Sequence, residues 1–581
     1  MLGASRVGPP LANDLAWPSG AYTRRMPARS VSLKALNRRE FLSLVLASAP
    51  VGLLAAACGS APAASPAPPL ATAVVSSAAR STPVAAAQPI TRGGTLRGVV
   101  QNDFVTMWPT VTTGPTADRC FDWLVRWRKG SDGRWGAQPG LAESWELGDK
   151  SATFKLRRGV KFHDDSNVNA EAVRWNIESW IKHPKSLARD NLGAVAVDTP
   201  AEVVDDYTVK INLNAAFGSL LSAVSDATET TGITSMAAYQ RLGEDGIRAQ
   251  AVGSGPFMFD AWQSGNQLWL KRNPDYWEKA EDGQPLPYLD SIVYRFVPDD
   301  SVRLAEMRST SADITDLIRG RDVPVVKADP DLTYIEDSSN GNRYRFFFNG
   351  KQGPFKDNQK LRQAIQYAID REAIARALGG GIGIRQRYDL TQGTLGYDET
   401  IPYYTFDLDK ARSLFAASGS PAGLQVRLTV IAREADQQQA QILQQMLEKI
   451  GVKLTIEALE RVAWGVKVRQ QNDFDMATQR TGTAVDPDPL FTLAWAAEGP
   501  AAYVRADVPE IQACIAQGRA SYDVASRQQA YQRCQTLMYD AAWWGYLWLQ
   551  PWNYVLNKRV RGAQPMWLSN NWREEVLWLA S

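Results

Sequence analysis

Histidine is almost absent from this chain: its 581 residues include only His163 and His183. Histidine-rich zinc, nickel and iron sites are therefore not expected, and a histidine-based catalytic triad would have to use one of these two side chains. His163 lies in a Lys-Phe-His-Asp-Asp turn that it helps to order, and His183 precedes a proline at a helix end, so we expect neither to bind a metal. Cysteine is also scarce, with four residues, too few for a fold built on disulfide bonds.

An excess of charge of one sign is lacking too. The formal net charge is +2, from 64 basic and 62 acidic residues, which argues against a nucleic-acid-binding protein. The signatures of nucleotide hydrolysis and zinc proteolysis, Gly-x-x-x-x-Gly-Lys and His-Glu-x-x-His, do not occur. Residues 253–255, Gly-Ser-Gly, lack the spacing of a nucleophile elbow, although the many acidic residues leave a carboxylate pair for glycoside hydrolysis open. These patterns give no support for an enzyme or for a cofactor.

Long apolar runs are missing except for residues 44–57, which follow Arg38 and Arg39 and end at Cys58. A basic segment followed by a short apolar run is typical of a secretory signal and is too short for a permanent membrane span. The arginine pair, followed by x-Phe-Leu, resembles a twin-arginine export signal. Residues 1–25 resemble neither a signal nor a folded segment, which makes Met26 an alternative start.

The end of the same run, Leu-Ala-Ala-Ala-Cys at residues 54–58, resembles a bacterial lipobox. In a lipobox the cysteine receives a diacylglyceryl group and becomes the mature N-terminus, so we expect Cys58 to be lipidated; an ordinary cleaved signal with an incidental cysteine is the alternative. Residues 59–90 are mostly Ala, Pro, Ser and Val with one charge, a composition that predicts a disordered tether. Residues 1–58 are thus interpreted as a lipoprotein signal. We expect the folded part of the chain at the outer face of the cytoplasmic membrane or in the periplasm.

Periodicity in the body predicts an α/β fold in more than one lobe. Residues 424–430 alternate as a strand, residues 442–450 place apolar side chains on one helix face, and residues 452–456 alternate again. Strand, helix and strand with short connections form a βαβ unit, which implies a parallel sheet. A second helix is predicted from a cap at Asp357 or Asn358 to about Gly379, and further strands are predicted at 152–156, 208–213, 267–271 and 343–348.

Cys514 and Cys534 lie on two predicted helical stretches, 508–518 and 524–540, which a short polar turn joins. Antiparallel helices would bring the two side chains together, and an exported protein permits a disulfide. A disulfide and a pair of buried thiols are both compatible with this pattern.

Four blocks of sequence, preceded by Gly-Gly-Thr-Leu at 93–96, resemble the solute-binding proteins of the peptide/nickel class that serve ABC importers, and they occur in that family's order across roughly residues 91–560. The blocks are Pro-Gly-Leu-Ala-Glu-Ser-Trp-Glu at 139–146 with 154–164; Gly-Ser-Gly-Pro-Phe at 253–257 with Arg-Asn-Pro-Asp-Tyr-Trp at 272–277; residues 348–349, 354–355 and 361–372; and Asp-Pro-Asp-Pro at 486–489.

This resemblance implies a periplasmic-binding-protein-like fold of two α/β lobes with an extra subdomain on lobe I. Lobe I would comprise residues 91–125, 206–338 and 552–581, its subdomain residues 126–205, and lobe II residues 339–551. Such a protein closes as a monomer around a solute and presents it to a membrane permease coupled to an ATPase. A secreted α/β hydrolase, or a surface receptor or chaperone of the same fold without a transporter, are the alternatives.

The resemblance also implies a ligand site between the lobes. The residues expected to contact the ligand are Asn102, Trp108, Phe348, Asn349, Arg480, Thr483, Asp486 and Trp495. Dipeptide-binding relatives hold the ligand's ammonium with an Asp and its carboxylate with an Arg, and here Thr483 and Gln437 fall at those positions, with Arg433 four residues away. A dipeptide would thus lose two charge-assisted contacts, so a longer peptide or a neutral oligosaccharide is expected.

Overall fold

The computed structural model describes residues 89–103, 106–111, 117–130, 134–280, 282–495, 503–564 and 573–580. The expected export signal with Arg38, Arg39 and Cys58, and nearly all of the expected tether, lie outside the described residues. Residues 86–581 form one compact unit. Within the described part of this unit, no helix combines the length and the apolar character that crossing a membrane requires.

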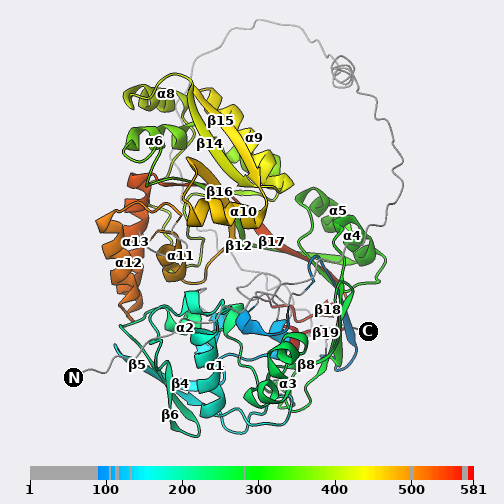
Figure 1. The fold of residues 1–581 in the computed structure, drawn as a ribbon. Helices are drawn as coiled ribbons and strands as arrows, with labels where there is room; N and C mark the ends of the chain where they lie inside the picture. Colours follow the sequence, from blue (N-terminus) through cyan, green and yellow to red (C-terminus); the bar gives the residue numbers. More distant parts are fainter. Residues whose placement is uncertain are drawn as a thin grey trace, which may run out of the picture. The chain divides into compact units, whose positions relative to one another are not determined.

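In the described residues of this unit, eleven strands form one mixed sheet (Figure 1). Its order is β15-β14-β16-β12-β17-β11-β1-β10-β9-β8, with β13 paired to β17. The two central strands, β12 (Leu332–Phe348) and β17 (Trp544–Asn557), are antiparallel and pair from Leu332 opposite Asn557 to Phe347 opposite Trp544. Both strands are long, so each packs into one core near one end and into another core near its other end. Together they join two halves of the molecule.

The half that contains the N-terminal strand is called the first lobe here, and its core extends from Leu96 to Leu577. Strands β1 and β10 are parallel, whereas β8, β9 and β10 form an antiparallel edge. A smaller core around Met307 and Val326 packs two helices against this part of the sheet. The elements of this lobe are β1 (Thr95–Val100), α2 (Leu220–Ala223), α3 (Met236–Ala249), β8 (Phe257–Gln263), β9 (Gln267–Arg272), β10 (Ser291–Phe296), α4 (Asp300–Arg308), β11 (Ile314–Asp316), α5 (Val323–Ala328), β18 (Val560–Arg561) and β19 (Trp578–Leu579).

A separate antiparallel sheet, β4-β5-β7-β6, has its own core with Phe154 and Trp180 fully buried. Its helix starts after Asn169, whose side chain accepts a hydrogen bond from the amide of Ala172 and so caps the first turn. The core of this part runs from Leu124 to Ile233, whereas the resemblance implies a subdomain of residues 126–205. Its elements, with the neighbouring hairpin, are β2 (Val125–Lys129), β3 (Trp135–Pro139), β4 (Ala142–Leu147), β5 (Ser151–Leu156), α1 (Ala170–Lys182), β6 (Ala201–Asp205) and β7 (Thr208–Asn212).

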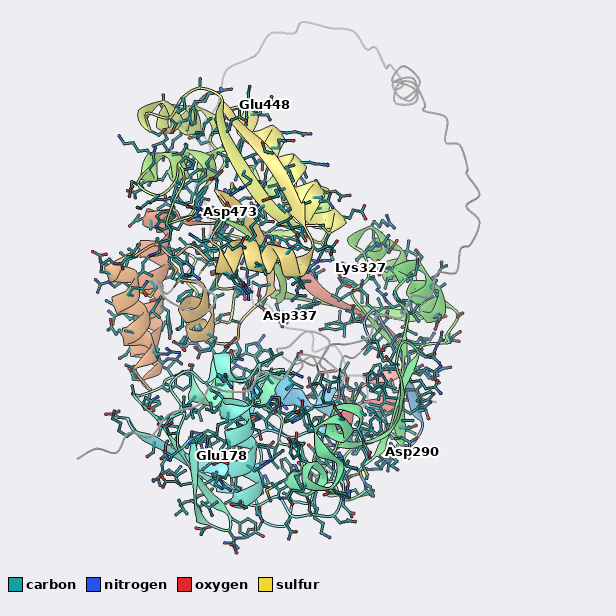
Figure 2. All side chains as sticks on the ribbon, viewed as in Figure 1. Glu178, Asp290, Lys327, Asp337, Glu448 and Asp473 are labelled. Carbon is teal, nitrogen blue, oxygen red and sulfur yellow. A yellow bond between two sulfur atoms is a disulfide. The ribbon has the colours of Figure 1, made fainter. Side chains whose placement is uncertain are left out.

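The other half, called the second lobe here, has a single core that runs from Tyr344 to Trp548. Figure 2 places Glu448 in this lobe and Asp290 in the first, with Asp337 of β12 between them. The elements are α6 (Gln359–Ala368), α7 (Arg371–Leu378), β13 (Ile384–Arg385), α8 (Leu408–Ala417), β14 (Leu424–Ile431), α9 (Glu434–Glu448), β15 (Val452–Leu459), α10 (Arg461–Gly465), β16 (Met476–Gly482), α11 (Pro487–Ala494), α12 (Pro509–Arg519) and α13 (Val524–Ala541).

Within the second lobe, β14 and β15 are parallel and α9 connects them, as the periodicity indicates. The single helix predicted up to Gly379 is wrong: the segment forms two helices, because Ile369 is extended and Asp370 caps α7 by accepting from the amide of Ala373. Cys514 of α12 and Cys534 of α13 form a disulfide.

The Gly-Ser-Gly motif at 253–255 serves packing. A Cβ at Gly253 would lie 2.0 Å from the carbonyl oxygen of Cys120, and one at Gly255 would lie 2.6 Å from the amide nitrogen of Phe121. The hydroxyl of Ser254 donates to buried Asp122 at 3.0 Å. Only glycine allows this close approach of two backbone segments, so the motif holds the first lobe together.

Candidate functional site

A cavity of about 1090 Å³ lies between the two lobes. The first lobe lines it with the residues after β1 and β11 and with residues 222–230, and the second lobe with the ends of β14, β15 and β16. The central strands contribute Asn342 and Tyr344 from β12 and Gln550 and Trp552 from β17. A space of this size accepts a ligand of several residues, and its walls belong to both lobes.

Four of the expected ligand contacts line this cavity: Asn102, Arg480, Thr483 and Asp486. Asn102 follows β1 and is exposed, and Arg480 is exposed near the end of β16. Thr483 uses its hydroxyl in a hydrogen bond to Asn340. Asp486 is 3% exposed, and the same carboxylate oxygen caps α11 through the amide of Asp488 and accepts from Arg527 at 2.8 Å. Its carboxylate is therefore occupied by the protein itself.

Trp108 does not line the cavity, contrary to expectation. Its side chain is 1% exposed, and its ring lies 4.9 Å from that of His183 and 5.7 Å from that of Tyr239, measured between centroids. His183 is correspondingly half-buried. The apolar cluster with Ala238 and α3 holds this tryptophan inside the first lobe.

Phe348 and Asn349 are likewise interior residues. Phe348 packs against Phe355 with a ring separation of 4.3 Å. The side-chain Nδ2 of Asn349 donates to the carbonyl oxygens of Asn472 and Phe474 at 2.9 and 2.7 Å. Asn349 thus connects the end of β12 to the segment before β16. Neither side chain reaches the cavity wall.

Trp495 also belongs to the core and not to the cavity. It is 5% exposed, and its ring centroid lies 5.9 Å from that of Trp544. It is the C-cap residue of α11 and belongs to the core of the second lobe.

Among the residues of the cavity wall that were not expected there are Glu229, Tyr344, Arg433, Arg461 and Trp552. Arg433, not Gln437, faces the cavity, because α9 begins at Glu434 and Arg433 is its N-cap residue. An arginine therefore faces the cavity four residues before Gln437, and its contact with a ligand carboxylate is a prediction. The signal was present in the sequence, since Arg433 and Arg461 follow predicted strands, and ligands of α/β proteins bind at the carboxyl ends of parallel strands.

The charges of this cavity are unevenly compensated. Asp300 is paired with Arg303 at 2.5 Å and also with Arg319, and Asp486 is paired with Arg527. Glu229 has no ion pair among the described residues, and burial raises its pKa to about 7 although Arg119 lowers it. The second-lobe wall carries three arginines, and the pKa of Arg433 is lowered by burial first and by Arg480 next.

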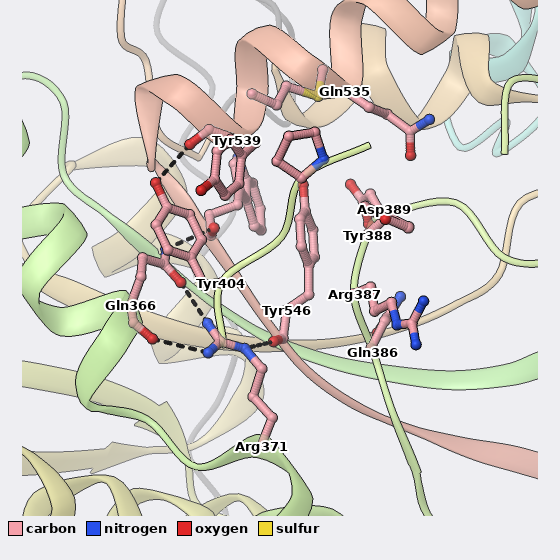
Figure 3. A pocket seen from close by; sticks show the side chains of 13 residues that line it. Gln366, Arg371, Gln386, Arg387, Tyr388, Asp389, Tyr404, Gln535, Tyr539 and Tyr546 are labelled. Carbon is pink, nitrogen blue, oxygen red and sulfur yellow. Dashed lines mark hydrogen bonds between the residues drawn. The ribbon is translucent and has the colours of Figure 1, made fainter. Parts of the chain in front are cut away.

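A smaller cavity in the second lobe, about 20 Å³, is an interior packing feature (Figure 3). Arg371 fills one side of it, donating to the side-chain oxygen of Gln366 at 2.6 Å and to the carbonyl of Tyr546 at 2.5 Å. The hydroxyl of Tyr404 donates to the carbonyl of Tyr539 at 2.8 Å. This space has the size of about one water molecule, too small for a transported solute.

Metal coordination has no candidate site in the described ranges, where no group of three His, Cys, Asp or Glu side chains is placed to hold an ion. His163 packs against the Gly-Ser-Gly motif, with its Nε2 3.0 Å from the carbonyl oxygen of Gly255.

Comparison with known sequences identifies relatives of this chain. Residues 136–503 match the model of the bacterial extracellular solute-binding proteins, family 5 (middle region). The glutathione-binding protein GsiB of Salmonella typhimurium is 31% identical over 323 residues, 55% of this chain and 60% of that protein. GsiB of Pectobacterium atrosepticum is 29% identical over 422 residues, 70% of this chain and 79% of its own length. The chain thus spans less than two thirds of the Salmonella relative.

Solved structures give the same result for the fold. HbpA2 from Haemophilus parasuis superposes with a TM-score of 0.73 at 26% identity, covering 84% of this chain and 100% of that one. DppA from Helicobacter pylori, solved in complex with the peptide STSA, superposes with a TM-score of 0.70 at 22% identity, covering 84% and 98%. The architecture is that of two-lobe periplasmic binding proteins.

Proposed function

Because the chain belongs to the bacterial extracellular solute-binding proteins of family 5, we propose that it is the substrate-binding component of an ABC importer for peptide-like ligands. The observation that carries this proposal is the cavity of about 1090 Å³ whose walls come from both lobes. A ligand that contacts both walls favours the closed arrangement, which a permease can then recognise. In this proposal the protein performs no chemistry, and its partners are the permease and the ATPase.

Peptide-like ligands fit the cavity better than neutral oligosaccharides. Arg433 and Arg480 supply guanidinium groups for a carboxylate, and Glu229 supplies a carboxylate for an ammonium group. The stacked pair Tyr344 and Trp548, with ring centroids 4.2 Å apart, supports one wall. The relatives point the same way, since one is named for glutathione and one was solved with a tetrapeptide.

The test is a thermal-shift screen of the full chain with pools of peptides and of oligosaccharides. A ligand at a hundredfold excess over Kd stabilises the folded state by about 2.7 kcal/mol, which raises Tm by a few degrees. A shift with peptides and no turnover of them supports the proposal. Hydrolysis of a pool member would favour the secreted hydrolase, and the absence of neighbouring permease genes would favour a receptor or chaperone.

Anchoring by lipid is a second part of the proposal. The lipobox-like segment ends at Cys58, and the described residues contain no membrane-spanning helix. Cys58→Ser should release the protein from the membrane fraction, whereas Arg38→Lys with Arg39→Lys should block export through the twin-arginine route. A Cys58→Ser variant that stays with the membrane contradicts the anchor, and unchanged export of the double variant contradicts the route.

A further inference from the structure

Three arginines stand in a row at one edge of the second-lobe sheet. Strands β15, β14 and β16 are neighbours and all parallel, so their carboxyl ends meet at the same edge. Arg433 follows the end of β14 by two residues, Arg461 follows the end of β15 by two, and Arg480 lies two residues before the end of β16. The register pairs Ile431 with Leu459 and Thr429 with Ala477, which sets the three positions at nearly the same level.

Adjacent strands of a sheet lie about 4.8 Å apart, so the backbone positions of the three arginines are neighbours. All three side chains line the cavity. Their electrostatic coupling agrees with this placement, because Arg480 and Arg461 both lower the pKa of Arg433.

The row is only partly compensated. In the part of the chain that the structure describes, Arg461 and Arg480 form no salt bridge, and Arg433 approaches Asp436 at 3.8 Å. Asp436 is buried beside the row and attracts both Arg433 and Arg480, so it balances part of their charge. Of the other carboxylates on the wall, Asp300 and Asp486 pair with arginines as described above, and Asp103 accepts from the indole of Trp262 and the hydroxyl of Ser264. Arginines remain charged at any physiological pH, so three positive charges of the second lobe face the cavity.

We propose that this row is the acidic-group subsite of the ligand cavity and selects peptide-like solutes that carry at least two carboxylates or another group of equal negative charge. One carboxylate would be satisfied by one guanidinium in a bidentate pair, and three guanidinium groups exceed that need. Glu229 on the first-lobe wall would receive the ligand's single ammonium group. This inference rests on the proposed function and specifies its substrate class.

The experiment compares acidic and neutral ligands of the same shape on the full chain, by isothermal titration calorimetry. One probe set is glutathione, its monoethyl ester and its diethyl ester, which carry two, one and no free carboxylates. The other is a tripeptide pool rich in Asp and Glu beside the matched pool with Asn, Gln and an amidated C-terminus. We expect each lost carboxylate to weaken binding by about 10- to 100-fold, and the acidic pool to bind at low salt more tightly than at high salt.

Three variants, Arg433→Gln, Arg461→Gln and Arg480→Gln, test the row itself. Each variant should weaken binding of the acidic probe by about tenfold or more and leave the affinity for the neutral probe unchanged. Arg533→Gln is the matched control, because Arg533 is exposed on α13 and lies outside the cavity lining. In the ligand-free protein, Arg461→Gln should leave Tm unchanged or raise it, since it removes repulsion without breaking an ion pair.

Equal binding of the acidic and neutral pools would overturn the subsite and leave the peptide-binding function standing. Binding by neither pool would overturn both. A lower Tm for ligand-free Arg461→Gln would show that this side chain stabilises the fold, and the assignment would then fail even with peptides bound elsewhere in the cavity.

Discussion

A tryptophan in a core and a tryptophan on a cavity wall differ in what their removal costs. Trp495 packs against Trp544 and is 5% exposed, so its truncation leaves a void that the second lobe cannot fill. Trp495→Ala should therefore lower the unfolding free energy of the ligand-free protein by about 3–5 kcal/mol, measured by denaturant titration. Phe406→Ala, at a position that is 48% exposed, is the control and should change stability by much less. If the ligand-free Trp495→Ala protein is as stable as the parent, the placement of Trp495 in the core is contradicted and a position on the cavity wall is favoured.

His163 is expected to make stability depend on pH. Burial lowers its pKa to about 4, despite the opposing effect of the Gly255 carbonyl, whereas the unfolded chain has a pKa of about 6.5. Between these values the unfolded chain binds a proton that the folded protein does not, so stability is full above pH 6.5 and decreases as pH falls towards 4.

The expected loss from His163 alone is about 2 kcal/mol between pH 7 and pH 4.5. His163→Gln should reduce the difference in unfolding free energy between these two pH values by that amount, measured by urea denaturation at each pH. If the variant keeps the parent's full pH dependence, His163 is not the titrating group.

At the scale of elements, the pairing of β12 with β17 depends on one position without a side chain. Gly341 lies at an irregularity in the register, and a Cβ there would lie 2.1 Å from the carbonyl oxygen of Gln550. Because the obstacle is backbone, Gly341→Ala should force the two strands apart and lower the unfolding free energy by about 1–3 kcal/mol. Gly136→Ala in β3 is the matched control, since nothing lies within 4 Å of the added carbon. Equal stability of the two variants would contradict this account.

Elements with a strong local period were predictable, and their interruptions were not. The strand, helix and strand of residues 424–456 follow from alternation and a single apolar helix face. The break between α6 and α7 was missed because Ile369 and Asp370 sit inside a continuous helical pattern, where only the observed cap separates two helices from one. A local pattern therefore predicts which elements form more reliably than it predicts where each element ends.

The candidate site was predictable in part, and most clearly next to a motif. Thr483 and Asp486 accompany the Asp-Pro-Asp-Pro block and do line the cavity, whereas Trp108 and Trp495 are large aromatic residues whose orientation no local pattern reveals. Glu229 and Trp552 reach the cavity through tertiary packing of distant segments. Arg433 and Arg461, by contrast, could have been found from the ends of the predicted parallel strands.

At the scale of the whole molecule, the lobes share two strands and otherwise have separate cores, so we expect a ligand to change their separation. An acidic tripeptide at a hundredfold excess over Kd should lower the radius of gyration of the full chain in small-angle X-ray scattering and stabilise it by about 2.7 kcal/mol. The neutral tripeptide at the same concentration is the control and should produce neither effect. Stabilisation without compaction would mean that the ligand binds one lobe only.

The pairing of Leu332 with Asn557 also has a mechanical consequence. The chain enters the second lobe and leaves it at adjacent points. A force that separates these two residues would therefore break the β12–β17 hydrogen bonds one after another, starting at this pair. A force along the strands would instead load those bonds simultaneously. The junction should therefore yield readily to peeling at its first-lobe end and resist sliding along its length.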